Sequence, residues 1–154
     1  MEENELLVVI VVYNDHENVE IDLSIPTGLD LLVYDNSQFP SDFSYLGPIK
    51  YVHDSRNLGI CFAYNYALNL ASKGGKKFLL LLDQDSIISS DYFDAFNRVK
   101  NLSEAVCFLP QVYDVRSNKK VSPLWLNDFG FKSGGTKVDL ATRGRISAIN
   151  SGSI

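Results

Sequence analysis

The sequence predicts an α/β fold: a Rossmann-like, mostly parallel central sheet flanked by helices. Three observations support this prediction. Short β-type runs alternate with helical runs over the first 110 residues. The run Leu6–Tyr13 (LLVVIVVY) is continuously apolar and rich in β-branched residues, as in a strand covered on both faces. From Ile60 the apolar residues recur with the period of a helix. We expect one domain over residues 1–154.

Three further strands are expected before residue 90, each a short apolar run with polar residues at its end. They are Leu31–Asp35 (LLVYD), Ile49–His53 (IKYVH) and Lys77–Leu82 (KFLLLL). A short polar segment precedes the second strand and ends near Pro26-Thr27-Gly28. Helix is one of the structures expected for it.

Two helices follow from the spacing of apolar residues. The first has one stripe that begins at Ile60, and Gly74-Gly75 predicts its end. The stripe consists of Ile60, Ala63, Tyr64, Ala67, Leu68 and Ala71. Ser90 is placed to cap the second helix, with Asp91 in its first turn. The expected inner face of that helix consists of Tyr92, Phe93, Phe96 and Val99.

The pattern is weaker after residue 104. A strand is expected over 105–113, a polar turn between two strands over 116–120, mainly loop over 122–144, and a strand over 145–151. Because the chain stops just after Ser151-Gly152-Ser153, we expect the natural fold to be truncated here and to continue beyond Ile154.

Composition and charge limit the function. The chain is 45% hydrophobic and 21% charged, as in a soluble globular protein. No dense basic face is visible, which argues against nucleic acid as the main partner. The first apolar run is too short to cross a bilayer and follows an acidic start, so neither a signal peptide nor a membrane span is expected. The bases between residues 119 and 145 form either a solvated loop or a surface for an anionic acceptor or lipid headgroup.

Polar residues gather where the predicted strands end. Ligands of open α/β sheets bind beyond the carboxyl ends of the strands. The four polar ends are Tyr13-Asn14-Asp15, Asp35-Asn36-Ser37, Asp54-Ser55-Arg56-Asn57 and Asp83-Gln84-Asp85-Ser86. We therefore expect carboxylates, amides and a guanidinium to converge at one edge of the sheet.

Asp83 and Asp85 are the sharpest feature of this edge. Two carboxylates one residue apart repel each other unless a cation compensates, and Mg²⁺ or Mn²⁺ commonly bridges such groups to substrate phosphates. A turn or helix-capping pair is the alternative without a metal. A calcium-binding EF-hand loop is excluded because Ile87 and Ile88 occupy positions that need an oxygen ligand and a glycine. A phosphatase of the haloacid dehalogenase type, with Asp83 as nucleophile, stays open as the second hypothesis.

The other candidates each have a structural alternative. Gly59 at the start of a helix, with Arg56 nearby, suits a phosphate but also suits an ordinary turn. Asp35 is a candidate to accept a hydrogen bond from a base or ribose, or else to form an Asx-turn. Tyr13 is either a stacking partner for a base or a half-buried strand aromatic. His16 and His53 are expected to be structural or exposed.

Four blocks together resemble the first half of the family 2 glycosyltransferases, which have the GT-A fold. The blocks are VVIVVYN (8–14), VYDNS (33–37), RNLGICFAYNYAL (56–68) and FLLLLDQDS (78–86), in the order of the family. The resemblance covers about residues 6–113, with a weaker echo in INSGSI (149–154). The DQD form with DNS and RNLG is similar to bacterial rhamnosyltransferase-like members.

The resemblance implies an inverting, metal-dependent transfer from a nucleotide-sugar donor, dTDP-rhamnose or a UDP-sugar, to a glycan or lipid-linked acceptor in bacterial surface polysaccharide synthesis. Asp85, with Asp83, would bind Mg²⁺ or Mn²⁺. The implied nucleotide-sugar-binding residues are Tyr13, Asn14, Asp35, Arg56, Asn57, Gly59 and Asp83. Tyr13 and Asp35 would hold the base, Arg56 and Asn57 would lie near the ribose-diphosphate, and Asp83 would reach the ribose.

The catalytic base of such enzymes lies beyond the Ser-Gly-Ser segment, so we expect it beyond Ile154. We therefore expect this chain to bind donor and metal but to transfer no sugar by itself. The expected location is the cytoplasm, with peripheral contact at the inner face of the membrane.

Overall fold

The computed structural model describes residues 5–13, 25–26, 28–89, 91–101, 112–114, 117–121, 124–127 and 130–133. The chain divides into two compact units, Met1–Phe96 and Asn97–Ile154, which are taken here one at a time.

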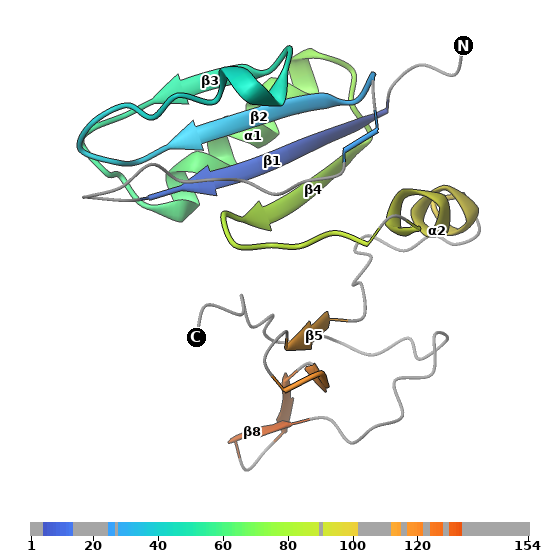
Figure 1. Cartoon of the computed structure of the whole chain (residues 1–154). Helices are drawn as coiled ribbons and strands as arrows, with labels where there is room; N and C mark the ends of the chain where they lie inside the picture. Colours follow the sequence, from blue (N-terminus) through green and yellow to red (C-terminus); the bar gives the residue numbers. More distant parts are fainter. Residues whose placement is uncertain are drawn as a thin grey trace. The chain divides into compact units, whose positions relative to one another are not determined.

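The first unit is built on a four-stranded parallel sheet (Figure 1). Its strands are β1 (Leu6–Val12), β2 (Asp30–Asp35), β3 (Lys50–His53) and β4 (Phe78–Asp83), in the order β3-β2-β1-β4. The predicted α/β class and parallel sheet are confirmed, and the expected strand boundaries hold to within one or two residues. After β3 the chain crosses back to the far side of β1, so the order reverses between β1 and β4.

Helix α1 (Ile60–Lys73) covers one face of the sheet (Figure 1). Its buried residues are the three alanines Ala63, Ala67 and Ala71, spaced four apart along one stripe. Two of them pack with Leu7, Val9 and Leu32 of the sheet. Small side chains let the helix lie close to the strands. Ile60 and Leu68, at the margins of the predicted stripe, are 40% and 56% exposed, so the buried face of the helix is narrower than the stripe.

The opposite face carries a larger apolar cluster. Residues from β1, β2 and β4 pack there with Phe43 of the β2–β3 connection and Phe93 of α2 (Tyr92–Val99). The buried members are Leu6, Val8, Ile10, Val12, Leu31, Val33, Phe43, Leu82 and Phe93. Both faces of β1 are therefore covered, which explains its uninterrupted apolar sequence. On α2, Tyr92 and Phe96 pack against this cluster as predicted, but Val99 is 38% exposed and does not belong to the inner face.

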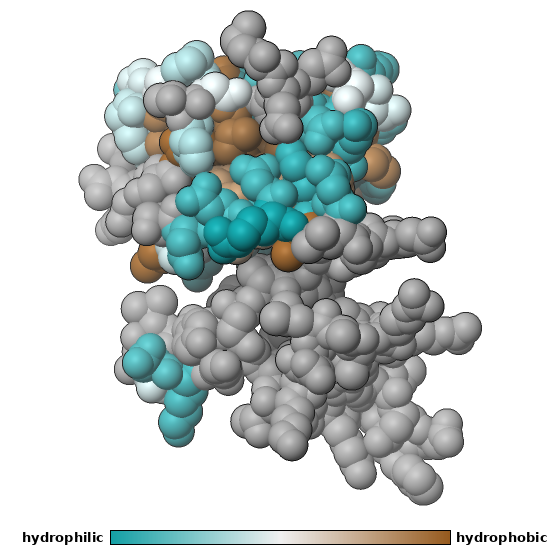
Figure 2. All heavy atoms as spheres, turned by 90° about the vertical axis from the view of Figure 1, so that its right-hand side faces the viewer, coloured by the Kyte–Doolittle hydropathy of each residue, from teal (hydrophilic) through white to brown (hydrophobic). Residues whose placement is uncertain are grey.

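The amino ends of the strands are tied by charged groups. Lys76 pairs with Asp30 and Lys77 pairs with Glu5, while the backbone N–H groups of Lys77 and Phe78 both donate to the Glu5 carbonyl. Figure 2 looks at the molecule from the side of these strand ends and shows hydrophilic atoms gathered over much of the described surface. Charged and hydrophilic side chains thus lie between the apolar strands and solvent at this end of the sheet.

In the second unit, two antiparallel strand pairs are described. Strand β5 (Val112–Asp114) pairs with β6 (Lys119–Val121), and β7 (Leu124–Asn127) pairs with β8 (Gly130–Ser133). The expected polar turn is confirmed at residues 117–118, where Asn118 has a φ of 50°. The expectation of loop over 122–144 is wrong at β7 and β8, because four-residue strands are too short to show a clear period.

Some expectations lie outside the described residues. They are the polar piece before Pro26, most of the strand expected over 105–113 and the strand expected over 145–151. Among the described residues, neither α1 nor α2 has the length and apolar character of a membrane-crossing helix.

Candidate functional site

The candidate site lies at the carboxyl edge of the sheet, where the strand order reverses between β1 and β4. Open α/β sheets bind their ligands at such a switch point. The ends of the two strands are joined by the backbone N–H of Tyr13, which donates to Oε1 of Gln84 at 2.8 Å. The middle residue of the Asp83-Gln84-Asp85 triplet therefore anchors the triplet to β1.

Asp83 ends β4 in a tight turn. Its backbone N–H donates to Oγ of Ser86 at 3.1 Å, and the Ser86 N–H donates back to the Asp83 carbonyl at 3.1 Å. Asp83 is partly buried, whereas Asp85 is exposed. Burial, and after it the charge of Asp85, raises the pKa of Asp83 above its ordinary value of 3.8. Among the described residues no basic side chain pairs with either carboxylate, which is the electrostatic setting a bound cation relieves.

The pair fits a cation that is delivered by its substrate. Within the described residues, no group of three or more His, Cys, Asp or Glu side chains could enclose a metal. Mg²⁺ is usually held by one or two carboxylates, with substrate phosphates and water completing its shell. Asp83 and Asp85 together match that smaller ligand set.

The amino-terminal part of α1 carries Tyr64, which is close enough to Asp83 to feel its charge. α1 contacts β1 and β4, and the pKa of Tyr64 is raised by burial and then by the charge of Asp83. Gly59 is the N-cap of the helix and no side chain caps it. Backbone N–H groups at the start of a 14-residue helix, together with its dipole, favour an anion. A diphosphate between this helix end and a cation on Asp83 and Asp85 would meet positive charge from both sides.

Gly59 is required by its backbone conformation. Its φ of 84° and ψ of 171° lie in a region that only glycine adopts readily, although a Cβ at this position would meet no atom within 4 Å. We expect Gly59→Ala to lower the free energy of unfolding by about 1–3 kcal/mol in urea denaturation. Gly74→Ala is the comparison at the other end of α1, where φ is negative. An unchanged stability in Gly59→Ala would contradict the strained geometry.

Arg56 is engaged by its neighbour Asp54. Nε and Nη2 of Arg56 donate to the two carboxylate oxygens at 2.8 and 2.7 Å, and the hydroxyl of Tyr34 donates to the same carboxylate at 3.3 Å. The bonds from Arg56 lower the pKa of Asp54 to about 2. Asp54 follows β3, so β2 and β1 lie between this pair and β4. A role of Arg56 at the diphosphate stays a prediction. Asn57, with a φ of 46°, closes the turn by donating its N–H to the Asp54 carbonyl at 3.2 Å.

Asp35 is a fully buried structural carboxylate. One oxygen accepts the N–H of Ser37 at 2.9 Å, which is the Asx-type bond expected as the alternative role. The other accepts the Tyr51 hydroxyl at 2.7 Å and the Ser41 N–H at 3.2 Å. Burial alone would raise the pKa of Asp35, but these hydrogen bonds outweigh it and lower the pKa below 3.8. A base would reach this carboxylate only by displacing donors of the protein.

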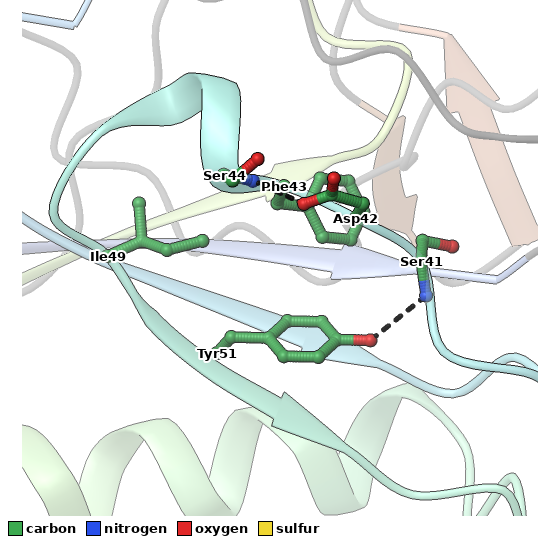
Figure 3. A pocket seen from close by; sticks show the side chains of 6 residues that line it. All are labelled: Ser41, Asp42, Phe43, Ser44, Ile49 and Tyr51. Carbon is green, nitrogen blue, oxygen red and sulfur yellow. Dashed lines mark hydrogen bonds between the residues drawn. The ribbon is translucent and has the colours of Figure 1, made fainter.

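The same group of contacts shapes the β2–β3 connection. Figure 3 shows the Tyr51 hydroxyl accepting the Ser41 N–H, at 3.1 Å, beside a hollow of about 220 Å³. The hollow is lined by Ser41, Asp42, Phe43, Ser44, Ile49 and Tyr51. His53 donates from Nε2 to the Ser37 carbonyl at 2.8 Å, so its expected structural role is confirmed. The hollow does not include the paired aspartates, and we do not place the site there.

Asn36 is a residue of this edge for which the sequence pattern predicts no separate role. Its backbone N–H donates to the Val12 carbonyl at 2.8 Å, which continues the β1–β2 ladder past the end of both strands. The side chain is only 3% exposed, and its Oδ1 has no hydrogen-bond donor. Its position directly after a buried strand was the one available signal. Asn14 and His16, also named from the sequence, lie outside the described residues.

Comparison with known protein families, with curated proteins and with solved structures found no match to this chain. The assignment of a function therefore depends on the geometry of the edge itself.

Proposed function

We propose that this chain is the nucleotide-sugar-binding part of a metal-dependent, inverting glycosyltransferase with a GT-A arrangement. The donor is a nucleoside diphosphate sugar, with dTDP-rhamnose first and a UDP-sugar second. The acceptor is a glycan or lipid-linked glycan of a bacterial surface polysaccharide, met at the inner face of the membrane.

One observation carries the proposal. Asp83 and Asp85, which pair with no basic side chain among the described residues, lie at the switch point of a parallel sheet, and Tyr64 of α1, whose N-cap Gly59 has no side-chain cap, is close enough to feel the charge of Asp83. Paired carboxylates and a helix N-terminus have opposite preferences for charge, and a metal–diphosphate complex satisfies both.

In the proposed complex, the donor runs across the ends of neighbouring strands. The diphosphate lies at β4 and α1, and the nucleoside extends over the ends of β1 and β2. Tyr13 is 47% exposed at the end of β1 and offers its ring to the base. A bound Mg²⁺ or Mn²⁺ supplies positive charge for the leaving nucleoside diphosphate. The residues of this chain hold and orient that group, and the N–H groups at the start of α1 stabilise its negative charge.

Calorimetric titration with UDP and with dTDP, each with Mn²⁺ and with excess chelator, tests the proposal. We expect saturable binding with Mn²⁺ and a loss of at least about tenfold in affinity without it, because two carboxylates would otherwise face a diphosphate directly. UMP with Mn²⁺ is the control for the contribution of the second phosphate.

Two outcomes would overturn the proposal. Binding of neither nucleotide at millimolar concentration would favour a domain that kept the fold and lost the site. Trapping of beryllium fluoride on Asp83, without nucleotide binding, would favour the phosphatase of the haloacid dehalogenase type.

A further inference from the structure

The hollow beside the β2–β3 connection has an aromatic lining. Its volume is about 220 Å³, and the rings of Phe43 and Tyr51 are among the groups that line it, with their centroids 5.6 Å apart. Tyr45, in the short helix η1 (Ser44–Leu46), is 56% exposed, and its ring centroid lies 6.3 Å from that of Phe43. An aromatic surface that is open to solvent therefore adjoins the hollow.

The charge of the hollow is negative. Among the described residues that line it, Asp42 alone carries a charge. Asp42 is exposed, and its Oδ1 accepts the N–H of Ser44 at 2.8 Å. This backbone bond is the largest reason that the pKa of Asp42 lies below its ordinary value of 3.8. In Figure 3, Asp42 and Ser44 lie on the side of η1, with Tyr51 across the hollow from them. An ionised carboxylate thus borders an aromatic hollow.

This lining limits the class of ligand. The Tyr51 hydroxyl donates to Asp35 and accepts the N–H of Ser41, so Tyr51 offers its ring rather than its hydroxyl. An anion would be repelled by Asp42. A small metal ion needs more oxygen ligands than one carboxylate, and no group of three His, Cys, Asp or Glu side chains occurs among the described residues. An organic ammonium group needs neither, because aromatic rings and a carboxylate both attract its charge.

We propose that this hollow binds an organic ammonium group of the quaternary, choline type, with its methyl groups against Phe43 and Tyr51 and its charge toward Asp42. The inference goes beyond the proposed function and does not depend on it, since the hollow shares no residue with the Asp83–Asp85 pair. Free choline and the phosphocholine headgroup of a lipid both carry this chemistry.

A pair of ligands of equal shape tests the inference on the unaltered chain. Amide NMR follows titration with choline and with its neutral isostere, in which a carbon atom replaces the ammonium nitrogen. We expect choline at millimolar concentration to shift the signals of Ser41, Asp42 and Ser44. The isostere should bind at least about tenfold more weakly, because it loses the attraction of both the rings and the carboxylate. Equal binding of the two ligands, or no shift of these signals, would overturn the inference while leaving nucleotide binding unaffected.

Asp42→Asn removes the charge and keeps an oxygen that can accept the Ser44 N–H. We expect the affinity for choline to fall about fivefold, the effect of two unit charges about 4 Å apart in water. The salt dependence of choline binding should disappear with it. Asp94→Asn is the matched control, because it removes an exposed carboxylate from the first turn of α2 and should leave the affinity unchanged. An unchanged affinity in Asp42→Asn, or an equal loss in both variants, would contradict a site at the hollow.

Vesicles of phosphatidylcholine distinguish the two sources of the ammonium group. Cosedimentation that is lost in Asp42→Asn would identify a lipid headgroup as a ligand. Choline binding without cosedimentation would identify a soluble ammonium compound, and either result supports the ammonium site.

Discussion

Asp85→Ala is expected to weaken Mn²⁺-dependent binding of UDP by at least about 100-fold. Changes that only reorient a metal ligand from outside the coordination shell commonly cost 10–100-fold, and this substitution removes a ligand itself. Within the described residues no third carboxylate, His or Cys joins Asp83 and Asp85 to take its place. Calorimetry in Mn²⁺ measures the loss. The control is Asp30→Ala, which removes a carboxylate from the amino end of the same sheet, and its affinity should equal that of the unaltered chain.

Asp83→Asn separates two effects of the Asp83 charge, its cost to the stability of the metal-free protein and its contribution to metal binding. Because burial and the charge of Asp85 raise the pKa of Asp83, its ionised form is less favourable in the folded chain than in the unfolded chain. We therefore expect Asp83→Asn to stabilise the metal-free protein slightly while metal-dependent binding is lost. A destabilised Asp83→Asn variant that still binds UDP with Mn²⁺ would show that the pair is a structural turn.

The same shift predicts a pH dependence of binding. A carboxylate must lose its proton to ligate a metal. Since the pKa of Asp83 is raised, affinity for Mn²⁺ and UDP should be full well above that pKa and should fall as the pH drops through it, at a higher pH than an ordinary aspartate would give.

The layout of the edge was predictable because it follows from local patterns. β1 and β4 are continuous apolar runs, and the polar residues that follow them must reach one edge once the strands are parallel. The sequence therefore predicts correctly that Tyr13 and Asp83 lie at one edge of the sheet. That their strands are neighbours is seen only in the structure, in the strand order and in the Tyr13–Gln84 bond.

The use of each polar group was not predictable, because it depends on partners distant in sequence. Asp35 and Asn36 are adjacent in sequence. The Asp35 carboxylate accepts a hydrogen bond from the hydroxyl of Tyr51, sixteen residues away, whereas Oδ1 of Asn36 accepts none. Arg56 likewise forms an ion pair with Asp54. This pair depends on the geometry of a turn, which the spacing of apolar residues does not predict. Sequence patterns place side chains at an edge; hydrogen bonds decide which of them face a ligand.

Asp35→Ala is expected to lower the free energy of unfolding by about 3–5 kcal/mol, the largest effect on stability among these substitutions. It leaves the N–H of Ser37 and the hydroxyl of Tyr51 without their acceptor, and each unsatisfied buried group costs about 1–3 kcal/mol. The Ser41 N–H loses one of its two acceptors and keeps the Tyr51 hydroxyl. Urea denaturation measures the change. Tyr51→Phe removes the bond to Asp35 and the bond from Ser41, whose N–H keeps the Asp35 carboxylate, and should cost about 1.5–3 kcal/mol, less than Asp35→Ala.

The free energy of unfolding measured at acidic pH tests the role of Asp35 independently. The folded-state pKa of Asp35 lies below its unfolded value of 3.8, so its stabilising effect is complete above that value and is lost as the pH falls through the lower folded-state pKa. Asp35→Asn should therefore flatten the loss of stability of the chain below about pH 4. Asp42→Ala is the control, because Asp42 is an exposed carboxylate of the β2–β3 connection whose pKa is also lowered. It shows how much of the pH dependence of stability a surface carboxylate contributes.

If Asp35 instead served the base, Asp35→Ala would spare stability and reduce UDP binding. Fully paired oxygens on a residue with no exposed surface favour the first result, because a carboxylate already holding three donors has little to offer a ligand.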